Sequence, residues 1–393
     1  MVACSKKNKK WQTKKCKTVQ CENGKTFKFS TRRCVKEKVT KTIYTKKTSQ
    51  SPLPHIEDIS KIKLLDSGSY GCVIQPSLHE TLFTVQSETY KNPNNLDIGK
   101  IFKEANSYKK ELKEVEKIKK LDPQHIFTPE IKAYGKIEYN IIKKLPTEIV
   151  RCLNYKSTFS YQIVMEYGGE NIHNTNYKMN YPDFIKSFLT LIEGMMLLKK
   201  NNYIHRDIKP LNVLVKKNKF TLIDFGLAIN VNRVYNKSEH FVLDSTYKYY
   251  PPEFYIAYAF NKLDLRKKTI TLNDLKDVEN FLEKNHYYHY LSEPDYLNYL
   301  KQRNKTFLDT IYTKKLTKFK DIFNKELAFK SDVFSLSFII DKYKKNIIFS
   351  TNKKIQLKQK NFIENIISKM YKHNSFERYT IEDVYNEFKK EVS

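Results

Sequence analysis

The sequence predicts an α+β fold, in which a small sheet-rich half with one main helix precedes a larger, mostly helical half. Three observations lead to this prediction. Short apolar runs separated by turn residues dominate the stretch from 60 to 167, one segment with an apolar residue at every third position (107–121) interrupts them, and long helix-like apolar segments follow residue 180. With 393 residues and 40% hydrophobic content, the chain can bury one large core or two medium ones.

The first part of the chain is strongly basic. Sixteen lysines and arginines against two glutamates give residues 1–50 a formal charge of +14, about half of the +29 of the whole chain. Because this stretch lacks hydrophobic periodicity and ends at the Pro-rich "SPLPH", we expect a disordered tail over 1–55 and a folded domain over 56–393. Such a tail can contact a polyanion such as nucleic acid, and a solvated segment that only aids solubility is the alternative.

Cysteine usage and hydropathy indicate the compartment. The six cysteines are scattered unevenly, at Cys4, Cys16, Cys21, Cys34, Cys72 and Cys152. We expect reduced thiols in an intracellular protein; zinc ligation by the first four is a weaker alternative, because C-x-x-C pairs and a nearby histidine are absent. The longest apolar run, 188–198, is interrupted by Glu193 and Gly194 and predicts a buried helix, so no membrane span is expected.

The elements of the folded domain follow from local pattern. In the first half, "IKLLDSGSYGCVI" (62–74) predicts strand, turn and strand, "DIGKIF" (97–102) and "YQIVMEY" (161–167) predict strands, and 107–121 predicts a helix. In the second half, "YPDFIKSFLTLIEGMMLLKKN" (181–201) predicts a long helix, and "NVLVKKNKFTLIDFG" (212–226) predicts a hairpin that turns at "KKNK".

The stretch "YIHRDIKPLNVLVKKNKFTLIDFGLA" (203–228) contains the groups that phosphoryl transfer needs. Asp207 is the candidate catalytic base, and Lys209 can neutralise charge on the transferred phosphoryl group. Asn212 and Asp224 are the candidate oxygen ligands for Mg²⁺. The combination of H-R-D-x-K-x-x-N with a following D-F-G is highly specific.

At these residues the sequence resembles the protein kinase family, of the serine/threonine type, from about residue 60 to the C-terminus. The resemblance implies a bilobal protein-kinase-like fold, with an N-lobe at about 56–167 and a C-lobe at about 168–393. It also implies ATP and Mg²⁺ as cofactors and protein substrates that carry the acceptor hydroxyl.

The family's glycine-rich loop, G-x-G-x-x-G-x-V, is matched by "DSGSYGCV" except that Asp66 replaces the first glycine. The resemblance implies that this loop covers the nucleotide through Leu65, Asp66, Ser67, Gly68, Ser69, Tyr70, Gly71, Cys72 and Val73. Because the second and third glycines are kept, we expect weakened ATP affinity rather than lost catalysis.

Other landmarks of the nucleotide site follow from the resemblance. Lys100 in "GKIF" matches the strand lysine that grips the α- and β-phosphates, with Lys103 as a nearby rival. Its ion-pair partner is predicted as Glu114, because Leu121 follows at the family spacing; Glu111, one turn earlier, is the alternative. "IVMEYGG" resembles the hinge, where Met165 guards the adenine pocket and Glu166, Tyr167 and Gly168 offer backbone groups to adenine.

Downstream, "STYKYYPPEF" resembles the end of an activation segment. Thr246 matches the threonine that bonds to the catalytic Asp and Lys in serine/threonine kinases, and Glu253 closes the Pro-Pro-Glu element. Arg378 matches the arginine that pairs with this glutamate, and Asp332 matches the carboxylate that supports the catalytic loop.

An insertion interrupts this pattern. Glu253 and Asp332 lie 79 positions apart, where the family spends about a dozen, so we place an insert at about 256–328. Its segment "TLNDLKDVENFLEKN" (271–285) predicts an amphipathic helix, and a Tyr-rich stretch follows. A partner or substrate contact and a passive elaboration of the large lobe are equally supported.

Three functions compete at this stage. The leading hypothesis is an active serine/threonine protein kinase; a pseudokinase scaffold that binds partners through the insert and the tail is the alternative, supported by Asp66 alone. A small-molecule kinase is disfavoured by Lys209, Thr246 and the Pro-Pro-Glu element. The layout is also similar to serine/threonine kinases of large nucleocytoplasmic DNA viruses, which implies a viral enzyme of the host cytoplasm or the virion.

Overall fold

The computed structural model describes residues 56–68, 71–79, 82–86, 96–153, 159–234, 249–285, 287 and 293–392, together with the backbone of the short strands β1 (Val2–Ala3), β2 (Lys17–Thr18), β3 (Lys25–Lys28) and β4 (Arg33–Lys36). The chain divides into two compact units, Met1–Leu53 and Pro54–Ser393. In the first unit β1 pairs with β2 and β3 with β4, both antiparallel. The predicted disorder of this unit and its zinc site stay predictions.

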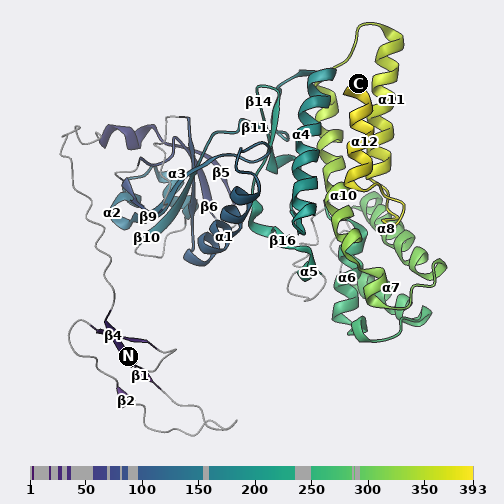
Figure 1. Ribbon diagram of the computed structural model, residues 1–393, viewed down its shortest axis with the longest axis horizontal. Helices are drawn as coiled ribbons and strands as arrows, with labels where there is room; N and C mark the ends of the chain where they lie inside the picture. Colours follow the sequence, from purple (N-terminus) through teal and green to yellow (C-terminus); the bar gives the residue numbers. More distant parts are fainter. Residues whose placement is uncertain are drawn as a thin grey trace. The chain divides into compact units, whose positions relative to one another are not determined.

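The second unit begins with a six-stranded antiparallel sheet (Figure 1). A 3₁₀ helix, η1 (Ile56–Lys61), precedes the strands β5 (Lys63–Ser67), β6 (Gly71–Gln75), β7 (Thr84–Val85), β8 (Ile98–Phe102), β9 (Ile131–Glu138) and β10 (Phe159–Met165). Their spatial order is β5-β6-β8-β10-β9-β7. Strand β8 is central, and Lys100 on it lies opposite Val73 of β6 on one side and Ile163 of β10 on the other.

Helix α1 (Ala105–Leu121) is the helix predicted over 107–121. It packs on the sheet through Tyr108, whose ring stacks on Tyr161 at 4.3 Å and meets the edge of Phe102 at 5.5 Å. These aromatic contacts fix the rotation of the helix about its own axis, and therefore decide which of its acidic residues faces the sheet.

Two short helices, α2 (Tyr139–Ile142) and α3 (Thr147–Leu153), follow β9. Cys152 on α3 forms a disulfide with Cys72 on β6. The expectation of reduced thiols is therefore wrong for this pair, because the fold brings their Cα atoms within 6.2 Å, a separation that a disulfide spans. The sequence could not show this proximity, since 80 positions separate the two residues.

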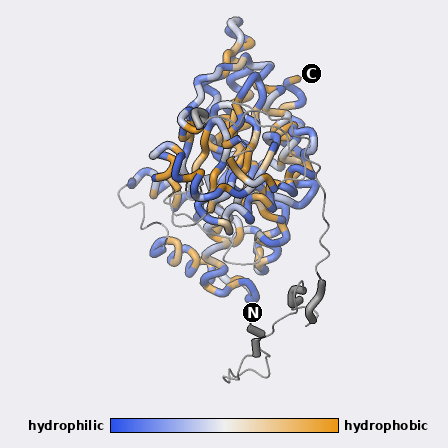
Figure 2. Tube along the Cα trace, turned by 90° about the vertical axis from the view of Figure 1, so that its left-hand side faces the viewer, coloured by the Kyte–Doolittle hydropathy of each residue, from blue (hydrophilic) through white to orange (hydrophobic). Residues whose placement is uncertain are grey.

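The helical half is built around α4 (Tyr181–Lys200), the buried helix that the sequence predicts over 181–201. Around it pack α10 (Lys325–Tyr343), α11 (Lys353–Met370) and α12 (Ile381–Val392) (Figure 1). Figure 2 shows apolar residues concentrated inside this unit and polar residues outside. Across the parts of the chain that the structure describes, every helix is too short or too polar to traverse a lipid bilayer.

The remaining segments of the helical half are short strands, short helices and the loops between them. The segments are β11 (Glu170–Asn171), β12 (Met179–Asn180), β13 (Tyr203–Ile204), η3 (Pro210–Asn212), β14 (Val213–Lys216), β15 (Lys219–Leu222), η4 (Phe225–Leu227), β16 (Ile229–Asn230), α5 (Val231–Val234), η8 (Lys344–Asn346) and β17 (Ile347–Ile348). The predicted hairpin over 212–226 is β14 paired with β15, and β13 pairs with β16.

The segment from Pro252 to Ile322, which contains most of the predicted insert, is helical and packs around a hydrophobic core that also includes Ile204 and Val231. It comprises α6 (Pro252–Lys262), η6 (Leu265–Lys267), α7 (Leu272–Asn285), α8 (Pro294–Thr313) and α9 (Phe319–Ile322). The helix predicted over 271–285 is α7, which buries Leu275, Val278 and Leu282. Arg303 of α8 is fully buried and donates to the carbonyl of Tyr250 at 3.1 Å, so the insert holds the chain just before α6.

Candidate active site

A buried ion pair joins the sheet to α1. The Nζ atom of Lys100 lies 2.7 Å from both carboxylate oxygens of Glu111 and 3.4 Å from Oδ1 of Asp224. Burial alone would lower the pKa of Lys100, but the negative charges of Asp224 and Glu111 outweigh it and raise the pKa above its ordinary value. Lys100 is therefore a permanent cation between two carboxylates.

The partner of Lys100 corrects one prediction. Glu114, the predicted partner, instead pairs with Lys117 at 2.7 Å. The alternative, Glu111, forms the ion pair with Lys100. The reason is the rotation of α1: Tyr108, Glu111 and Ile118 are its buried residues, so they form the face toward the sheet, and Glu114 lies beside that face.

Asp224 follows β15 in a left-handed conformation, with φ of 63°. The next residue, Phe225, is buried and its ring meets the edge of the His205 ring at 4.7 Å. Burial opposes ionisation of Asp224, but the nearby positive charges of Lys100 and Lys209 outweigh it and lower the pKa of Asp224 below its ordinary value. The backbone thus presents a carboxylate that stays ionised.

The loop between β13 and η3 brings three predicted side chains together. Lys209 Nζ lies 3.1 Å from both carboxylate oxygens of Asp207. The side-chain amide of Asn212 donates to the Asp207 carbonyl at 2.8 Å and to its Oδ2 at 2.7 Å. Asp207 is therefore held in one orientation by an amide on one side and an ammonium on the other.

Beneath this loop lies a buried carboxylate. Asp332 of α10 accepts the backbone N–H groups of His205 at 2.7 Å and of Arg206 at 2.9 Å. Arg206 adopts a positive φ of 67°, an uncommon conformation for a bulky residue, and these bonds help to hold it. Asp332 thus supports the catalytic loop, as the resemblance predicts.

His205 is a site residue to which the sequence assigned no role. Its Nδ1 accepts the N–H of Asp207 at 3.2 Å, and its Nε2 lies 3.1 Å from the carbonyl of Ile223, one residue before Asp224. Burial lowers the pKa of His205, which keeps the ring neutral and able to accept at one nitrogen and donate at the other. Its position in the H-R-D motif was the sequence signal that could have identified it as a site residue.

Gly68, directly after β5, and Gly71, the first residue of β6, are the two glycines that the predicted nucleotide loop keeps. Gly71 packs so closely on β8 that a Cβ there would lie 2.2 Å from the Ile101 carbonyl oxygen, so only glycine fits. Among the described residues, a Cβ at Gly68 would meet no atom within 4 Å. Lys103, the rival of Lys100, donates to the Gly68 carbonyl at 2.8 Å and so supports this loop.

The remaining loop residues divide into three groups. Leu65 is 48% exposed, so its apolar side chain is available to the flat face of an adenine. Asp66 is exposed and accepts the N–H of its neighbour Ser67 at 2.7 Å. Ser69 and Tyr70, like Thr246, lie outside the described residues.

The predicted hinge follows β10. The N–H of Glu166 donates to the Glu130 carbonyl at 2.9 Å, and the carbonyl of Tyr167 accepts from Lys216 at 2.8 Å. The carbonyl of Glu166 and the N–H of Gly168 bond to no other described residue. One acceptor and one donor are therefore available, the pair that an adenine edge requires.

The element after the activation segment is tied to the C-terminal part of the domain. Glu253 and Arg378 form a fully buried ion pair with an Oε1–Nη1 distance of 2.6 Å, and the Ser375 hydroxyl donates to Glu253 at 2.6 Å. This is the pair predicted from the Pro-Pro-Glu element and the late arginine.

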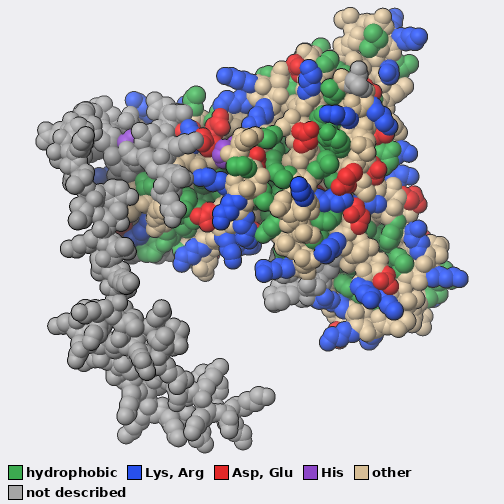
Figure 3. All heavy atoms as spheres, in the orientation of Figure 1, with side chains coloured by type: hydrophobic (Ala, Val, Ile, Leu, Met, Phe, Trp, Pro, Cys, Tyr) green, Lys and Arg blue, Asp and Glu red, His purple; other side chains and the backbone are tan. Residues whose placement is uncertain are grey.

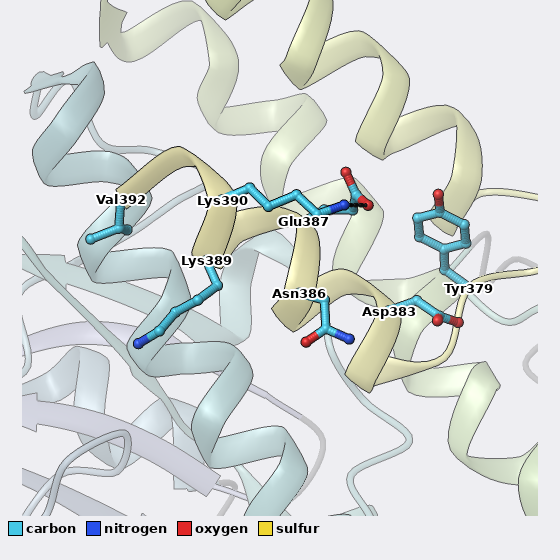
Figure 4. A pocket seen from close by; sticks show the side chains of 7 residues that line it. All are labelled: Tyr379, Asp383, Asn386, Glu387, Lys389, Lys390 and Val392. Atoms are coloured by element: carbon cyan, nitrogen blue, oxygen red, sulfur yellow. Dashed lines mark hydrogen bonds and ion pairs between the residues drawn. The ribbon is translucent and has the colours of Figure 1, made fainter.

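Two hollows flank the hinge region. A small cavity of about 40 Å³ behind Met165 is lined by Glu111, Asp224 and Phe225, and one of about 220 Å³ is lined by Glu166, Tyr167 and Gly168. A larger hollow on α12 (Figure 4) shares no residue with these, and its two lysines are balanced by Asp383 and Glu387. The chemistry therefore lies between the sheet and the helical half.

The residues fit ATP and Mg²⁺. Because both amide bonds of Asn212 come from its nitrogen, its side-chain oxygen remains as a ligand atom, and the Asp224 side chain is 34% exposed. An amide oxygen and an ionised carboxylate are the hard ligands that Mg²⁺ prefers. Lys100 adds a fixed cation for phosphate oxygens.

Comparison with known sequences agrees with this geometry. The profile of a family described as "Protein tyrosine and serine/threonine kinase" matches residues 59–264, which is more than half of the chain. The match covers the sheet, the catalytic loop and the start of the inserted region.

Individual relatives are distant and cover parts of the chain. A probable serine/threonine-protein kinase of Dictyostelium discoideum is 29% identical over 34% of this chain and 8% of its own length. Mitogen-activated protein kinase 5 of Arabidopsis thaliana is 25% identical over 47% of this chain and 43% of its own length. Cyclin-dependent kinase-like 5 of Homo sapiens is 32% identical over 24% of this chain and 10% of its own length. The chain thus spans less than half of each of these relatives.

Proposed function

Because the chain belongs to the protein kinase family, we propose that it is an active kinase that transfers the γ-phosphate of ATP to serine or threonine hydroxyls of proteins. One observation supports this most directly. Asp207, Lys209 and Asn212 are joined by hydrogen bonds, so a base, a cation and a metal ligand occupy one site. The intact Lys100 and Glu111 pair on the facing sheet provides the phosphate grip.

In the proposed reaction, Asp207 orients the acceptor hydroxyl and takes its proton as the hydroxyl oxygen bonds to the γ-phosphorus. The bond from that phosphorus to the β,γ-bridging oxygen breaks, and ADP leaves. Lys209 lies within 3.1 Å of Asp207, where it can neutralise charge on the moving phosphoryl group. Mg²⁺, held by Asn212 and Asp224, would supply charge neutralisation on the phosphates.

The other assigned roles complete the proposal. Leu65 to Val73 cover the nucleotide, Lys100 holds its phosphates, and Met165 to Gly168 line its base. Serine and threonine specificity is supported by Lys209 and by the similarity to distant serine/threonine kinases, and it rests further on Thr246 as a bonding partner of Asp207 and Lys209. An intracellular location follows from the use of ATP, and the viral origin stays a prediction.

The proposed domain limits also follow from the site. The kinase domain would occupy about 56–393, with its lobes joined near 167, and the insert would occupy about 256–328. The basic tail over 1–55 would be dispensable for catalysis and would carry any contact with a polyanion.

The test is the Asp207→Asn variant, assayed for transfer of labelled phosphate from ATP to protein. An amide cannot accept the proton, so we expect loss of activity with an unchanged melting temperature. Asp309→Asn, an exposed aspartate on α8, is the matched control and should retain activity. Phosphoamino acid analysis of the product should give phosphoserine or phosphothreonine. Full activity of Asp207→Asn would overturn the proposal.

A pseudokinase scaffold is the second candidate, favoured only by Asp66 in the nucleotide loop. It predicts that Mg²⁺ and ATP leave the melting temperature unchanged and that no phosphate is transferred. A thermal shift with nucleotide but no transfer under any condition would instead identify a nucleotide-binding scaffold.

A further inference from the structure

The inserted region builds a groove that the kinase chemistry does not use. It has a volume of about 920 Å³ and lies between η6, α9 and the start of α10. Six of its lining residues are basic and one, Asp264, is acidic; the basic residues are Arg266, Lys267, Lys268, Lys318, Lys320 and Lys325.

Backbone contacts connect the two segments that carry the basic side chains. The bridge between Thr269 and Lys318, with the bond from Ile270 N–H to the Thr317 carbonyl at 2.8 Å, clamps the two rims together. Arg266 stacks over the ring of Phe319 at 5.1 Å. The groove therefore has a cationic rim, and the Phe319 ring beneath Arg266 is buried in the hydrophobic core.

Four lysines of the rim have no acidic partner among the described residues. Lys267, Lys318, Lys320 and Lys325 are exposed, and none of them forms an ion pair with another described residue. Figure 3 shows Lys and Arg side chains recurring over the helical half, with fewer acidic ones. Like charges gathered at one concave surface repel one another unless an anion joins them.

The groove is adjacent to the catalytic loop. Its wall includes Val231, whose N–H donates to the Asn202 carbonyl at 2.7 Å. Asn202 immediately precedes β13, and β13 leads directly into His205 and Asp207. One wall of the groove is therefore hydrogen-bonded to the segment that leads into the catalytic loop.

We propose that this groove is a docking site for an acidic segment of the protein substrate, at a distance from the phosphorylated residue. That the bound segment belongs to a substrate rests on the proposed kinase function. The binding of an acidic segment in the groove does not depend on that function. Its volume of about 920 Å³ suits a short peptide segment, and the exposed lysines of the rim suit Asp and Glu carboxylates. The insert thereby gains a role in substrate selection.

The binding test uses the full chain and a fluorescein-labelled peptide of alternating Glu and Asp, followed by fluorescence anisotropy. The variant Lys267→Glu/Lys318→Glu/Lys320→Glu reverses three rim charges. The control Lys353→Glu/Lys354→Glu/Lys358→Glu reverses three exposed lysines on α11, and both chains keep the same basic tail. All of these side chains are exposed, so melting temperatures should match wild type.

We expect the groove variant to bind the peptide roughly tenfold more weakly, and the control to bind as wild type does. The difference should shrink as salt is added. Equal affinity of the two variants would overturn the proposal, and so would a single-stranded oligonucleotide that binds more tightly than the peptide and loses its affinity in the groove variant alone.

A kinetic arm separates this proposal from the proposed function. With a protein substrate that carries the acidic segment, the groove variant should raise KM and leave kcat unchanged, whereas a substrate without that segment should be unaffected. If no phosphate is transferred by any form but the groove variant still loses the peptide, the kinase proposal fails and the docking site stands. If the groove variant and wild type had the same KM for the substrate that carries the acidic segment, docking would be contradicted.

Discussion

Lys100 and Glu111 form a two-oxygen ion pair, in which the Nζ atom lies 2.7 Å from each carboxylate oxygen, and Asp224 lies 3.4 Å from the same nitrogen. The pair connects the central strand of the sheet to α1, and through Asp224 it connects both to the helical half. Three elements distant in sequence are thereby held by one ammonium group.

The first prediction concerns this pair. Glu111→Gln removes the charge that positions Lys100, so we expect kcat/KM for ATP to fall by on the order of 100-fold, as misplacement of a binding group does. Steady-state phosphorylation of a generic protein substrate measures it. Glu114→Gln is the matched control, because it removes a carboxylate one turn away that pairs with Lys117 rather than with Lys100. A larger loss for Glu114→Gln would restore the original assignment.

The contrast between these two glutamates shows how far the sequence could predict the site. Asp207, Asn212 and Asp224 lie in one short stretch whose spacing is characteristic, so the local sequence was enough to predict them as members of one site. Glu111 and Glu114 both lie near the required spacing, and the choice between them depends on the rotation of α1, which the stack of Tyr108 on Tyr161 sets. That contact joins residues more than fifty positions apart and leaves no local signature.

In the fold, too, features set by local sequence were predictable and features set by contacts between distant segments were not. The strands within 62–74, 97–102 and 161–167 were predictable, as were α1, α4 and α7, because apolar periodicity is a local property. Strands β7 and β9 of the same sheet were not predicted. The bond between Cys72 and Cys152 and the groove at η6 and α9 were not predictable, because each depends on how separate segments meet. His205 lay in a recognised motif, but its bonds to Asp207 and Ile223 are visible only in three dimensions.

The second prediction concerns the buried pair of Glu253 and Arg378. Arg378→Met leaves the Glu253 carboxylate buried with only Ser375 as a donor, so we expect the free energy of unfolding to fall by about 3 to 5 kcal/mol. Urea denaturation measures this loss. Lys301→Met breaks a half-exposed pair with Glu283 and should change stability little. Similar effects of the two variants would contradict the buried role.

The third prediction is an acid sensitivity. Burial, with the positive charges of Arg303 and Arg378, lowers the pKa of His373 to about 4. Between the unfolded pKa of about 6.5 and this value, the unfolded state binds a proton that the folded state does not. Stability therefore falls as the pH is lowered through this window, by at most about 3 kcal/mol from this group.

His373→Gln removes this titration and tests the prediction. The free energy of unfolding, measured by urea denaturation at pH values from about 7 to 5, should fall less steeply for the variant than for wild type. The slope that remains includes His205, whose pKa burial also lowers. Parallel slopes for variant and wild type would show that His373 titrates alike in both states.

The fourth prediction concerns Asp66, which replaces the first glycine of the nucleotide loop. Its carboxylate accepts the Ser67 N–H at 2.7 Å, so it both adds negative charge near the nucleotide and fixes the backbone of the loop. If the charge dominates, Asp66→Gly should lower the apparent KM for ATP by roughly threefold to tenfold, because repulsion of the triphosphate is removed.

Asp66→Asn separates the two effects, because it keeps a side-chain oxygen that can accept the Ser67 N–H but carries no charge. If charge dominates, Asn and Gly should lower KM alike, and the gain should shrink in high salt as the repulsion is screened. A wild-type KM for Asn with a raised KM for Gly would instead assign the aspartate to loop order. In that case the missing glycine costs no affinity, because the bond to Ser67 holds the loop in the conformation that a nucleotide needs.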